Sequence, residues 1–276
     1  MKLGIHQSFD GLMDAAYYAN AIGAKTCQVF IRNNRNCRSR SFDIYDFQAY
    51  NEFVQSTDFS DLVVHGVYTV NPVSSNPELY AKTVNVTKQD LYILRNLFGN
   101  KYYVIHPGSS LSIPTFDAVK RLSEFLHDIA NDLVSGLGDI KICVETMAGS
   151  GSQLLCQTKQ MFQLINLCKD IPQFAFTVDT CHIWGAGIGA NDLLKFLKYF
   201  DKELLGVLHV NNSCNAFGSQ VDRHANIRDG QIPTLDLIES VQDFHDWNQD
   251  CPIILETPSK GILQDYTLLS RFLHDA

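Results

Sequence analysis

The sequence predicts an α/β protein with the architecture of a (β/α)8 TIM barrel, and two observations support this prediction. Eight short apolar runs, rich in branched and aromatic residues, recur along the chain. Longer segments with apolar residues at three- and four-residue spacing separate these runs, as amphipathic helices require. Strand followed by helix, repeated eight times, is typical of a parallel barrel inside a ring of helices. An open, doubly wound sheet is the alternative fold.

The eight expected strands are spread along the whole chain. In order they are Leu3–His6, Thr26–Phe30, Asp61–His65, Tyr102–His106, Ile140–Thr146, Phe174–Thr180, Leu204–Val210 and Pro252–Thr257. Helical spacing follows the first strand at Leu12, Ala15 and Ala19. Such a segment has one apolar face, which can pack against the outside of a barrel.

The chain is expected to form one domain, residues 1–276. Its 276 residues, 45% of them hydrophobic, are enough to bury one large core. No Gly/Ser-rich linker, charge block or low-complexity tract divides the sequence. Two connections, Ile31–Phe42 and Asn211–Pro233, are long for loops that follow barrel strands, and long loops in compact domains are often functional.

Charge and cysteine content limit the expected partners and location. The chain has 22 basic and 30 acidic residues, which gives a net charge of -8. This overall charge repels nucleic acid, so any DNA contact needs local basic patches or bound cations. The eight cysteines contain no CxxC pair and indicate reduced thiols inside a cell. No signal peptide or membrane span is recognisable. We therefore expect a soluble, intracellular protein, cytoplasmic or nuclear, with a monomer as the default state.

Metal-ligand residue types stand at the carboxyl ends of six successive predicted strands. In a barrel these ends meet on one face, where barrel enzymes place their active sites. The adjoining loops add His182 and the pair Asp222 and His224. The nine candidate metal ligands are His65, His106, Glu145, Asp179, His182, His209, Asp222, His224 and Glu256.

The composition of this set indicates several metal ions. Imidazole and carboxylate without thiolate suit zinc, manganese or iron, and nine ligands exceed what one tetrahedral ion needs, so two or three ions are expected. Ions that share a carboxylate can activate water and hold both oxygens of a phosphoryl displacement. Glu145 is the expected bridge. A single histidine near a strand end is usually structural, but six successive strand ends favour a metal centre.

Other histidines carry weaker signals. His6 ends the first strand and is expected either to support the site or to be purely structural. His127, His245 and His274 fall in helical segments away from the predicted pocket. We expect these three side chains to face solvent.

Several motifs occur in the order known from one enzyme family. Val178–His182, and His209–Asn212 with Phe217–His224, are the most specific of them. Val104–Ser109, Val144–Thr146 with Ala148–Ser152, and Ile254–Thr257 follow the same order. By these motifs the chain resembles, over essentially its whole length, the endonuclease IV family of apurinic/apyrimidinic-site endonucleases in the xylose-isomerase-like barrel superfamily.

The resemblance implies a barrel with about three zinc ions per chain, with Mn²⁺ as an alternative at one site. One ion would be held by His65, His106 and Glu145, a second by Glu145, Asp179, His209 and Glu256, and a third by His182, Asp222 and His224. Glu145, Asp179 and Glu256 are the implied catalytic carboxylates. The family hydrolyses the phosphodiester 5′ to an abasic site in double-stranded DNA, in base-excision repair, and leaves a 3′-hydroxyl.

The segments expected to bind DNA match the family less completely. Arg35 and Tyr68 stand where the family inserts an arginine and a tyrosine into the duplex, whereas Cys37 and Thr69 depart from its pattern. Thr69 offers a smaller wedge against the base stack than the bulky apolar residue common there. The remaining expected DNA contacts are Arg32, in an arginine-rich loop, and Arg223.

Two other functions remain open from the sequence. A divalent-metal sugar isomerase or epimerase could use the same barrel, but it needs fewer ligands, so the group of His182, Asp222 and His224 discriminates against it. A non-catalytic DNA-damage binding module could also keep the fold. The intact ligand set argues against this second alternative.

Overall fold

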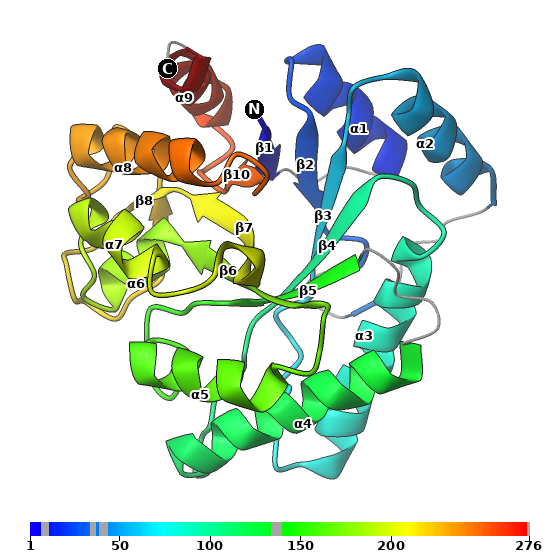
Figure 1. Ribbon diagram of the computed structural model, residues 1–276, viewed down its shortest axis with the longest axis vertical. Coiled ribbons are helices and arrows are strands. Elements are labelled where there is room, and N and C mark those ends of the chain that lie inside the picture. The colour runs from blue at the N-terminus through cyan, green and yellow to red at the C-terminus, as the bar shows by residue number, and fades with distance from the viewer. Residues whose placement is uncertain (7–10, 34–36, 39–43, 134–139, 275–276) are drawn as a thin grey trace.

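The computed structural model describes residues 1–6, 11–33, 37–38, 44–133 and 140–274. Within these residues, eight parallel strands close into a barrel in the order β1-β10-β7-β6-β5-β4-β3-β2 (Figure 1). The strands are β1 Leu3–His6, β2 Thr26–Val29, β3 Asp61–His65, β4 Asn100–Ile105, β5 Ile140–Glu145, β6 Phe174–Asp179, β7 Leu205–Val210 and β10 Ile253–Leu255. The barrel prediction is confirmed, and the open doubly wound sheet is wrong.

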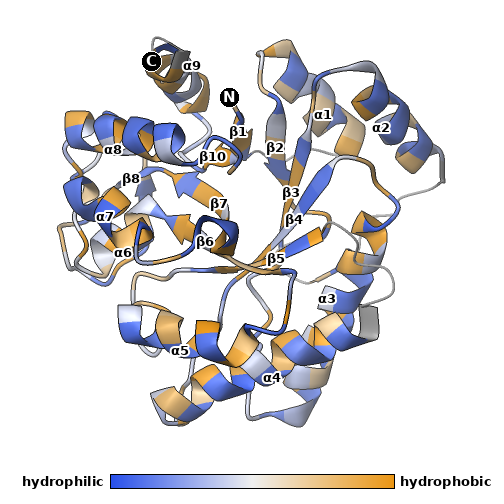
Figure 2. Ribbon diagram, in the orientation of Figure 1, coloured by the Kyte–Doolittle hydropathy of each residue, from blue (hydrophilic) through white to orange (hydrophobic). Residues whose placement is uncertain are grey.

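The helices surround the strands, as Figure 1 shows. They are α1 Leu12–Ala21, α2 Ile44–Ser56, α3 Pro77–Leu94, α4 Thr115–Leu133, α5 Thr158–Cys168, α6 Thr180–Gly185, α7 Leu193–Leu197, α8 Thr234–Trp247 and α9 Ile262–His274, with short 3-10 turns at Ala190–Asp192 and Lys202–Leu204. Figure 2 shows apolar and polar residues alternating around these helices. On α4, for example, Val119, Leu122 and Phe125 are fully buried against the core, as their spacing requires.

Local signals in the sequence explain where α3 begins. Asn76 stands just before the helix in extended conformation, and its side chain accepts hydrogen bonds from the backbone N–H groups of Glu78 and Leu79 at 2.9 and 3.2 Å. Pro77 occupies the first helical position, where no N–H is needed. This cap satisfies donors that the helix leaves unpaired.

The register of the barrel brings the polar strand ends to a common level. Asp179 at the end of β6 pairs with His209 in β7, and His209 is followed around the barrel by Ile254 of β10. His106 and Glu256 follow their strands by one residue instead of closing them. Both remain at the carboxyl-end face, so this shift of one residue leaves the predicted cluster intact.

The long connection after β7 contains secondary structure that the sequence did not predict. β8 Asn212–Ser213 and β9 His224–Ala225 form a short antiparallel pair, in which Ser213 lies opposite His224. The Asn212 side chain fastens this pair by donating to the backbone carbonyls of Ile227 and Ile232, each at 2.8 Å. The hairpin holds His224 over the barrel.

The three helical histidines differ in their surroundings. His245 on α8 is only 9% exposed, so the expectation that it faces solvent is wrong. His127 on α4 is partly exposed and lies 3.1 Å from an oxygen of Asp170. The side chain of His274 is outside the part that the structure describes.

Among the described helices, none combines the length and apolar character needed to cross a membrane.

Candidate metal centre

The nine predicted ligands lie together at the carboxyl-end face of the barrel. Their ligand atoms form three groups, within each of which all atoms lie within 4.8 Å of one another: His65, His106 and Glu145; Glu145, Asp179, His209 and Glu256; and His182, Asp222 and His224. A further group, Asp179, Cys181 and His224, overlaps the last two. Strands β3, β5, β6 and β7, helix α6, the turns after β4 and β10, and the β8–β9 hairpin supply these residues.

Hydrogen bonds to the backbone fix three of the histidine rings. Nδ1 donates to a backbone carbonyl oxygen at 2.7 Å in both His65 and His182, and at 3.0 Å in His224. In a neutral imidazole, a hydrogen on Nδ1 leaves the lone pair on Nε2. Among the described residues, the buried Nε2 atom of His182 has no hydrogen-bond partner. Each ring therefore presents Nε2 as a ligand atom, an arrangement typical of metal-binding histidines.

These lone pairs point at carboxylate oxygens. The Nε2 atoms of His65 and His106 both lie 3.2 Å from Oε2 of Glu145. On the other side, Asp222 lies 3.0 Å from Nε2 of His182 and 3.2 Å from Nε2 of His224. In the metal-free protein a proton on Nε2 can satisfy such a contact, in line with the raised pKa values of His182 and His224, and a divalent metal ion can replace that proton. The donor set and its tautomers therefore fit divalent metal ions.

Glu145 lies between the groups. While Oε2 faces His65 and His106, Oε1 lies 3.1 Å from Nδ1 of His209 and 3.3 Å from Nδ1 of His182. The carboxylate is 1% exposed and ends β5. Because its two oxygens face opposite halves of the cluster, Glu145 has the geometry of a bridging ligand.

The pKa shifts in the cluster reflect its excess of negative charge. Burial alone would raise the pKa of Glu145, but His209 and His106 outweigh it and hold this pKa well below its ordinary value. Burial opposes a charge on His224, yet Asp179 and Asp222 raise its pKa to about 10. Glu145 is thus ionised at neutral pH, and its carboxylate attracts positive charge.

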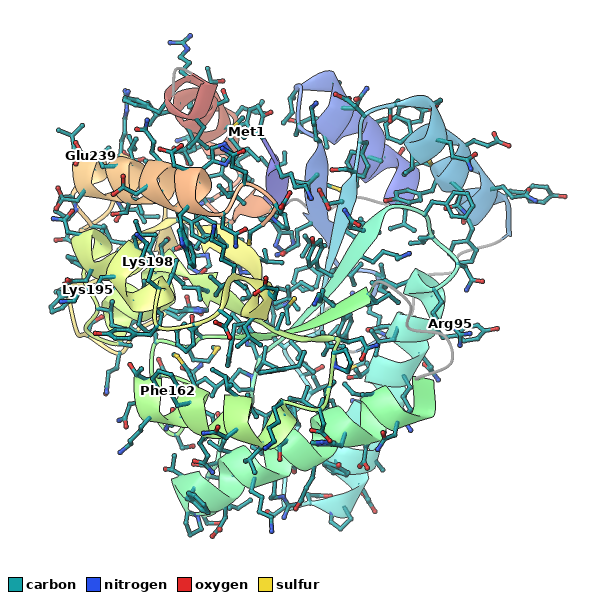
Figure 3. The ribbon with its side chains drawn as sticks, in the orientation of Figure 1. Met1, Arg95, Phe162, Lys195, Lys198 and Glu239 are labelled. Atoms are coloured by element: carbon teal, nitrogen blue, oxygen red, sulfur yellow. The ribbon has the colours of Figure 1, made fainter. Side chains whose placement is uncertain are left out.

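Within the described residues, the carboxylates of the pocket form no ion pair with a lysine or an arginine. Figure 3 shows the labelled cations Arg95, Lys195 and Lys198 on the outer helices. Among the described residues, the ion-pair partners within 4.0 Å of Glu145, Asp179, Asp222 and Glu256 are histidines. Among the described residues, histidines therefore compensate the charge of these carboxylates in the metal-free protein.

Three residues that sequence reasoning missed or left open hold these ligands in place. The fully buried Gln28 contacts both His209 and Glu256. Asn211 donates to Oδ2 of Asp179 at 2.7 Å, and Nδ1 of His6 lies 2.9 Å from Oε1 of Glu256. His6 is thus in contact with a candidate ligand. The available signal for Gln28 was a carboxamide inside an otherwise apolar strand.

Arg32, one of the expected DNA contacts, forms a buried ion pair with a residue of α3. Its side chain is 5% exposed, its Nε atom lies 2.5 Å from Oδ1 of Asp90 on α3, and its Nη1 donates to the backbone carbonyl of Cys37 at 3.1 Å. The guanidinium is thus engaged in a buried ion pair and not presented to solvent, and the expected DNA contact of Arg32 stays a prediction. Arg35 lies outside the described residues.

The other expected DNA contacts stand at the rim of the pocket. The Tyr68 side chain is 53% exposed, and its ring centre is 5.4 Å from that of His65 and 5.3 Å from that of His106. Thr69 and Arg223 are exposed. The Oγ1 atom of Thr69 lies 2.7 Å from Sγ of Cys37, so the two residues that depart from the family pattern are in contact.

A recess of about 160 Å³ opens beside these residues, and Tyr68, Asn71, His106, Ser109 and Gln153 contribute to its lining. It places open space directly beside the candidate ligand His106. A small polar group bound there would lie next to the metal cluster.

Comparison with known proteins identifies the family and the fold of the chain. Residues 16–272 match the xylose isomerase-like TIM barrel family. The chain is 32% identical over 263 residues to a protein named probable endonuclease 4 from Finegoldia magna, covering 94% of this chain and 91% of that protein. It superimposes on endonuclease IV from Thermus thermophilus with a TM-score of 0.84, 26% identity and full coverage of both chains. A D-tagatose 3-epimerase-like protein, 18% identical with a TM-score of 0.75 over 100% of this chain and 98% of that one, shares the fold.

Proposed function

Since this chain belongs to the endonuclease IV family of xylose isomerase-like TIM barrels, we propose that it is a zinc-dependent apurinic/apyrimidinic endonuclease. Its substrate is double-stranded DNA with an abasic site, cut 5′ to the lesion to leave a 3′-hydroxyl. The observation that carries this proposal is the meeting of nine histidine and carboxylate side chains in three adjoining ligand groups.

Each group holds one ion in this proposal. His65, His106 and Glu145 bind the first, Glu145, Asp179, His209 and Glu256 the second, and His182, Asp222 and His224 the third. When bound, the zinc ions supply Lewis acidity, which makes water a better nucleophile at neutral pH and offsets charge that develops on phosphate oxygens. Mn²⁺ suits the same nitrogen and oxygen ligands and is the alternative at one site.

The protein's own groups orient the catalytic carboxylates. Oδ1 of Asp179 accepts from the backbone N–H of His182 at 2.7 Å, and its Oδ2 accepts from Asn211. Glu256 is held by His6 and Gln28. Because both carboxylates are fixed before substrate arrives, little reorganisation is needed when the phosphate binds.

DNA binding is proposed to use the rim of the pocket. Tyr68 covers the rings of His65 and His106 on the solvent side and can stack against an exposed sugar or base. Arg223 is exposed next to Asp222 and can contact a phosphate. With a net charge of -8, the protein relies on such local contacts and on its bound cations.

A sugar isomerase or epimerase is the alternative on this fold. The group of His182, Asp222 and His224 disfavours it, because proton transfer on a sugar does not require a third metal site. The likeness to a D-tagatose 3-epimerase-like protein, at 18% identity, is one of fold alone.

Cleavage of a duplex with a single tetrahydrofuran abasic analogue tests the proposal. The analogue cannot undergo β-elimination, so only hydrolysis produces a nick. We expect one cut 5′ to the analogue, no cut in an undamaged control duplex, and loss of the cut after prolonged chelation. Absence of any nick from metal-loaded protein would refute the proposal and turn attention to sugar substrates.

A further inference from the structure

The side chain of Gln28 contacts two of the candidate metal ligands from inside the barrel. It lies in β2, fully buried, with His6 of β1 as its neighbour in the sheet. Its Oε1 lies 2.7 Å from Nε2 of His209, and its Nε2 contacts Oε1 of Glu256 and lies 2.9 Å from Nδ1 of His6. One carboxamide thus joins two proposed ligands of the second ion.

The chemistry of Glu256 determines which way this carboxamide points. An ionised carboxylate only accepts hydrogen bonds, so the group of Gln28 that faces Glu256 must be the NH₂. The carbonyl oxygen then faces His209. Because a carbonyl oxygen only accepts, Nε2 of His209 must carry a hydrogen. A neutral His209 ring is left with its lone pair on Nδ1.

That lone pair faces the second group of ligands. Nδ1 of His209 lies 3.1 Å from Glu145, 3.3 Å from Glu256 and 4.0 Å from Asp179. The backbone-bonded histidines of the cluster use the opposite arrangement, with Nδ1 as donor and Nε2 toward the carboxylates. His209 therefore needs a side chain, not a backbone carbonyl, to set its tautomer.

We propose that Gln28 is the positioning residue that holds His209 in the Nε2–H tautomer and Glu256 in its orientation, and so assembles the binding site of the second ion. The identity of the second ion as zinc rests on the proposed function, whereas the tautomer of His209 does not depend on it. A carboxamide suits this place because it donates to a carboxylate and accepts from an imidazole at once. Methionine fills a similar volume and does neither. Glutamate accepts from His209 but places a second anion against Glu256.

The test uses Gln28→Met and Gln28→Glu, with Gln160→Met as the matched control. Gln160 is also buried, at 5% exposed, but lies on α5 and accepts from the backbone N–H of Cys156 at 3.1 Å, away from the ligands. The first readout is the ¹⁵N-edited NMR spectrum of zinc-loaded protein with ¹⁵N-labelled histidine. The second is zinc affinity by competition with a chelator. Neither readout involves DNA.

In the wild-type protein and in Gln160→Met, His209 should show a slowly exchanging Nε2 proton. In Gln28→Met we expect that signal to be lost and one zinc ion to bind about 10- to 100-fold more weakly, the usual cost of removing a hydrogen-bond partner from a metal ligand. Gln28→Glu should keep the Nε2 proton, because its carboxylate still accepts, while also weakening zinc binding.

An unchanged His209 signal together with unchanged zinc affinity in Gln28→Met would overturn the inference and leave Gln28 a packing residue. If Gln28→Met does not fold, Gln28→Glu tests the inference instead. Loss of the Nε2 proton of His209 in Gln28→Glu would contradict the assigned tautomer. Failure to nick abasic DNA, by contrast, would refute the proposed function without changing these spectra or affinities.

Discussion

Two buried clusters of charged side chains, one around Arg32 and Asp90 and the other at the candidate metal centre, have their charges balanced differently. In the first, the guanidinium of Arg32 pairs with Asp90 at 2.5 Å, and the hydroxyl of Tyr103 donates to the other oxygen of Asp90 at 3.0 Å. In the second, the metal centre, the buried Glu145 and Asp179 are joined by Glu256 and by Asp222 at the rim, and their nearest partners are histidines.

The difference separates a structural cluster from a binding site. Burying an ion pair costs desolvation energy that the pair itself largely offsets, so the Arg32–Asp90 cluster is complete within the protein. The metal centre has four carboxylates against histidines that are neutral when they act as ligands, so under the proposed function cations from solution complete it. The predictions below test this contrast.

The largest effect is expected at Glu145. Glu145→Gln keeps the side-chain volume but removes the negative charge that faces both halves of the cluster. We expect cleavage of the tetrahydrofuran duplex to fall to background while the circular dichroism spectrum stays that of the wild type. Nicking at the wild-type rate would remove Glu145 from the mechanism.

In the Arg32–Asp90 cluster, the effect should fall on stability. Asp90→Asn leaves Arg32 buried without its counter-charge, which we expect to lower the free energy of unfolding by about 3–5 kcal/mol. Urea denaturation measures this loss. The double variant Arg32→Met with Asp90→Met should recover most of it, because no unpaired charge remains. Equal losses in the single and double variants would argue against a paired cluster.

Metal removal should distinguish the clusters again. With free zinc at a hundred times its dissociation constant, binding stabilises the folded protein by about 2.7 kcal/mol per site. Chelation should therefore lower the free energy of unfolding of the wild type and of Asp90→Asn by the same amount. Chelation should lower the free energy of unfolding of Glu145→Gln by a smaller amount. A larger chelation effect in Asp90→Asn than in the wild type would mean that the two clusters are coupled.

The smallest effect is expected at His127, outside both clusters. Burial opposes its charge, but the backbone carbonyl of Ser123 and the carboxylate of Asp170 outweigh burial and raise its pKa. A raised pKa in the folded state stabilises the protein below the unfolded value of about 6.5, and this contribution is lost as the pH rises through the folded value. The stability difference between wild type and His127→Gln should therefore be larger at acidic than at alkaline pH. A difference that does not change with pH would contradict this.

The features predicted most accurately from the sequence are the residue positions that the geometry of the sheet determines. His65, Asp179 and His209 could be placed together because parallel strands in a barrel end on one face, whatever their separation along the chain. The β8–β9 hairpin that carries His224 could not be predicted, because its two-residue strands leave no periodic pattern.

Side-chain direction in loops is harder to predict than strand ends. The basic character of the sequence around Arg32 was evident, but the burial of the Arg32 side chain depends on Asp90, 58 residues away on α3. Gln28 is a similar case, since its role depends on contacts with His209 and Glu256 that only the closed barrel creates. Long-range partners of single polar residues leave no local signal.

Titration of metal-free protein with zinc, while nicking of the tetrahydrofuran duplex and bound zinc are both followed, tests most directly whether external cations complete this centre. We expect no nicking without metal, and activity that rises with occupancy until about three ions are bound per chain, one for each ligand group. Full nicking by protein that holds no metal would contradict the account.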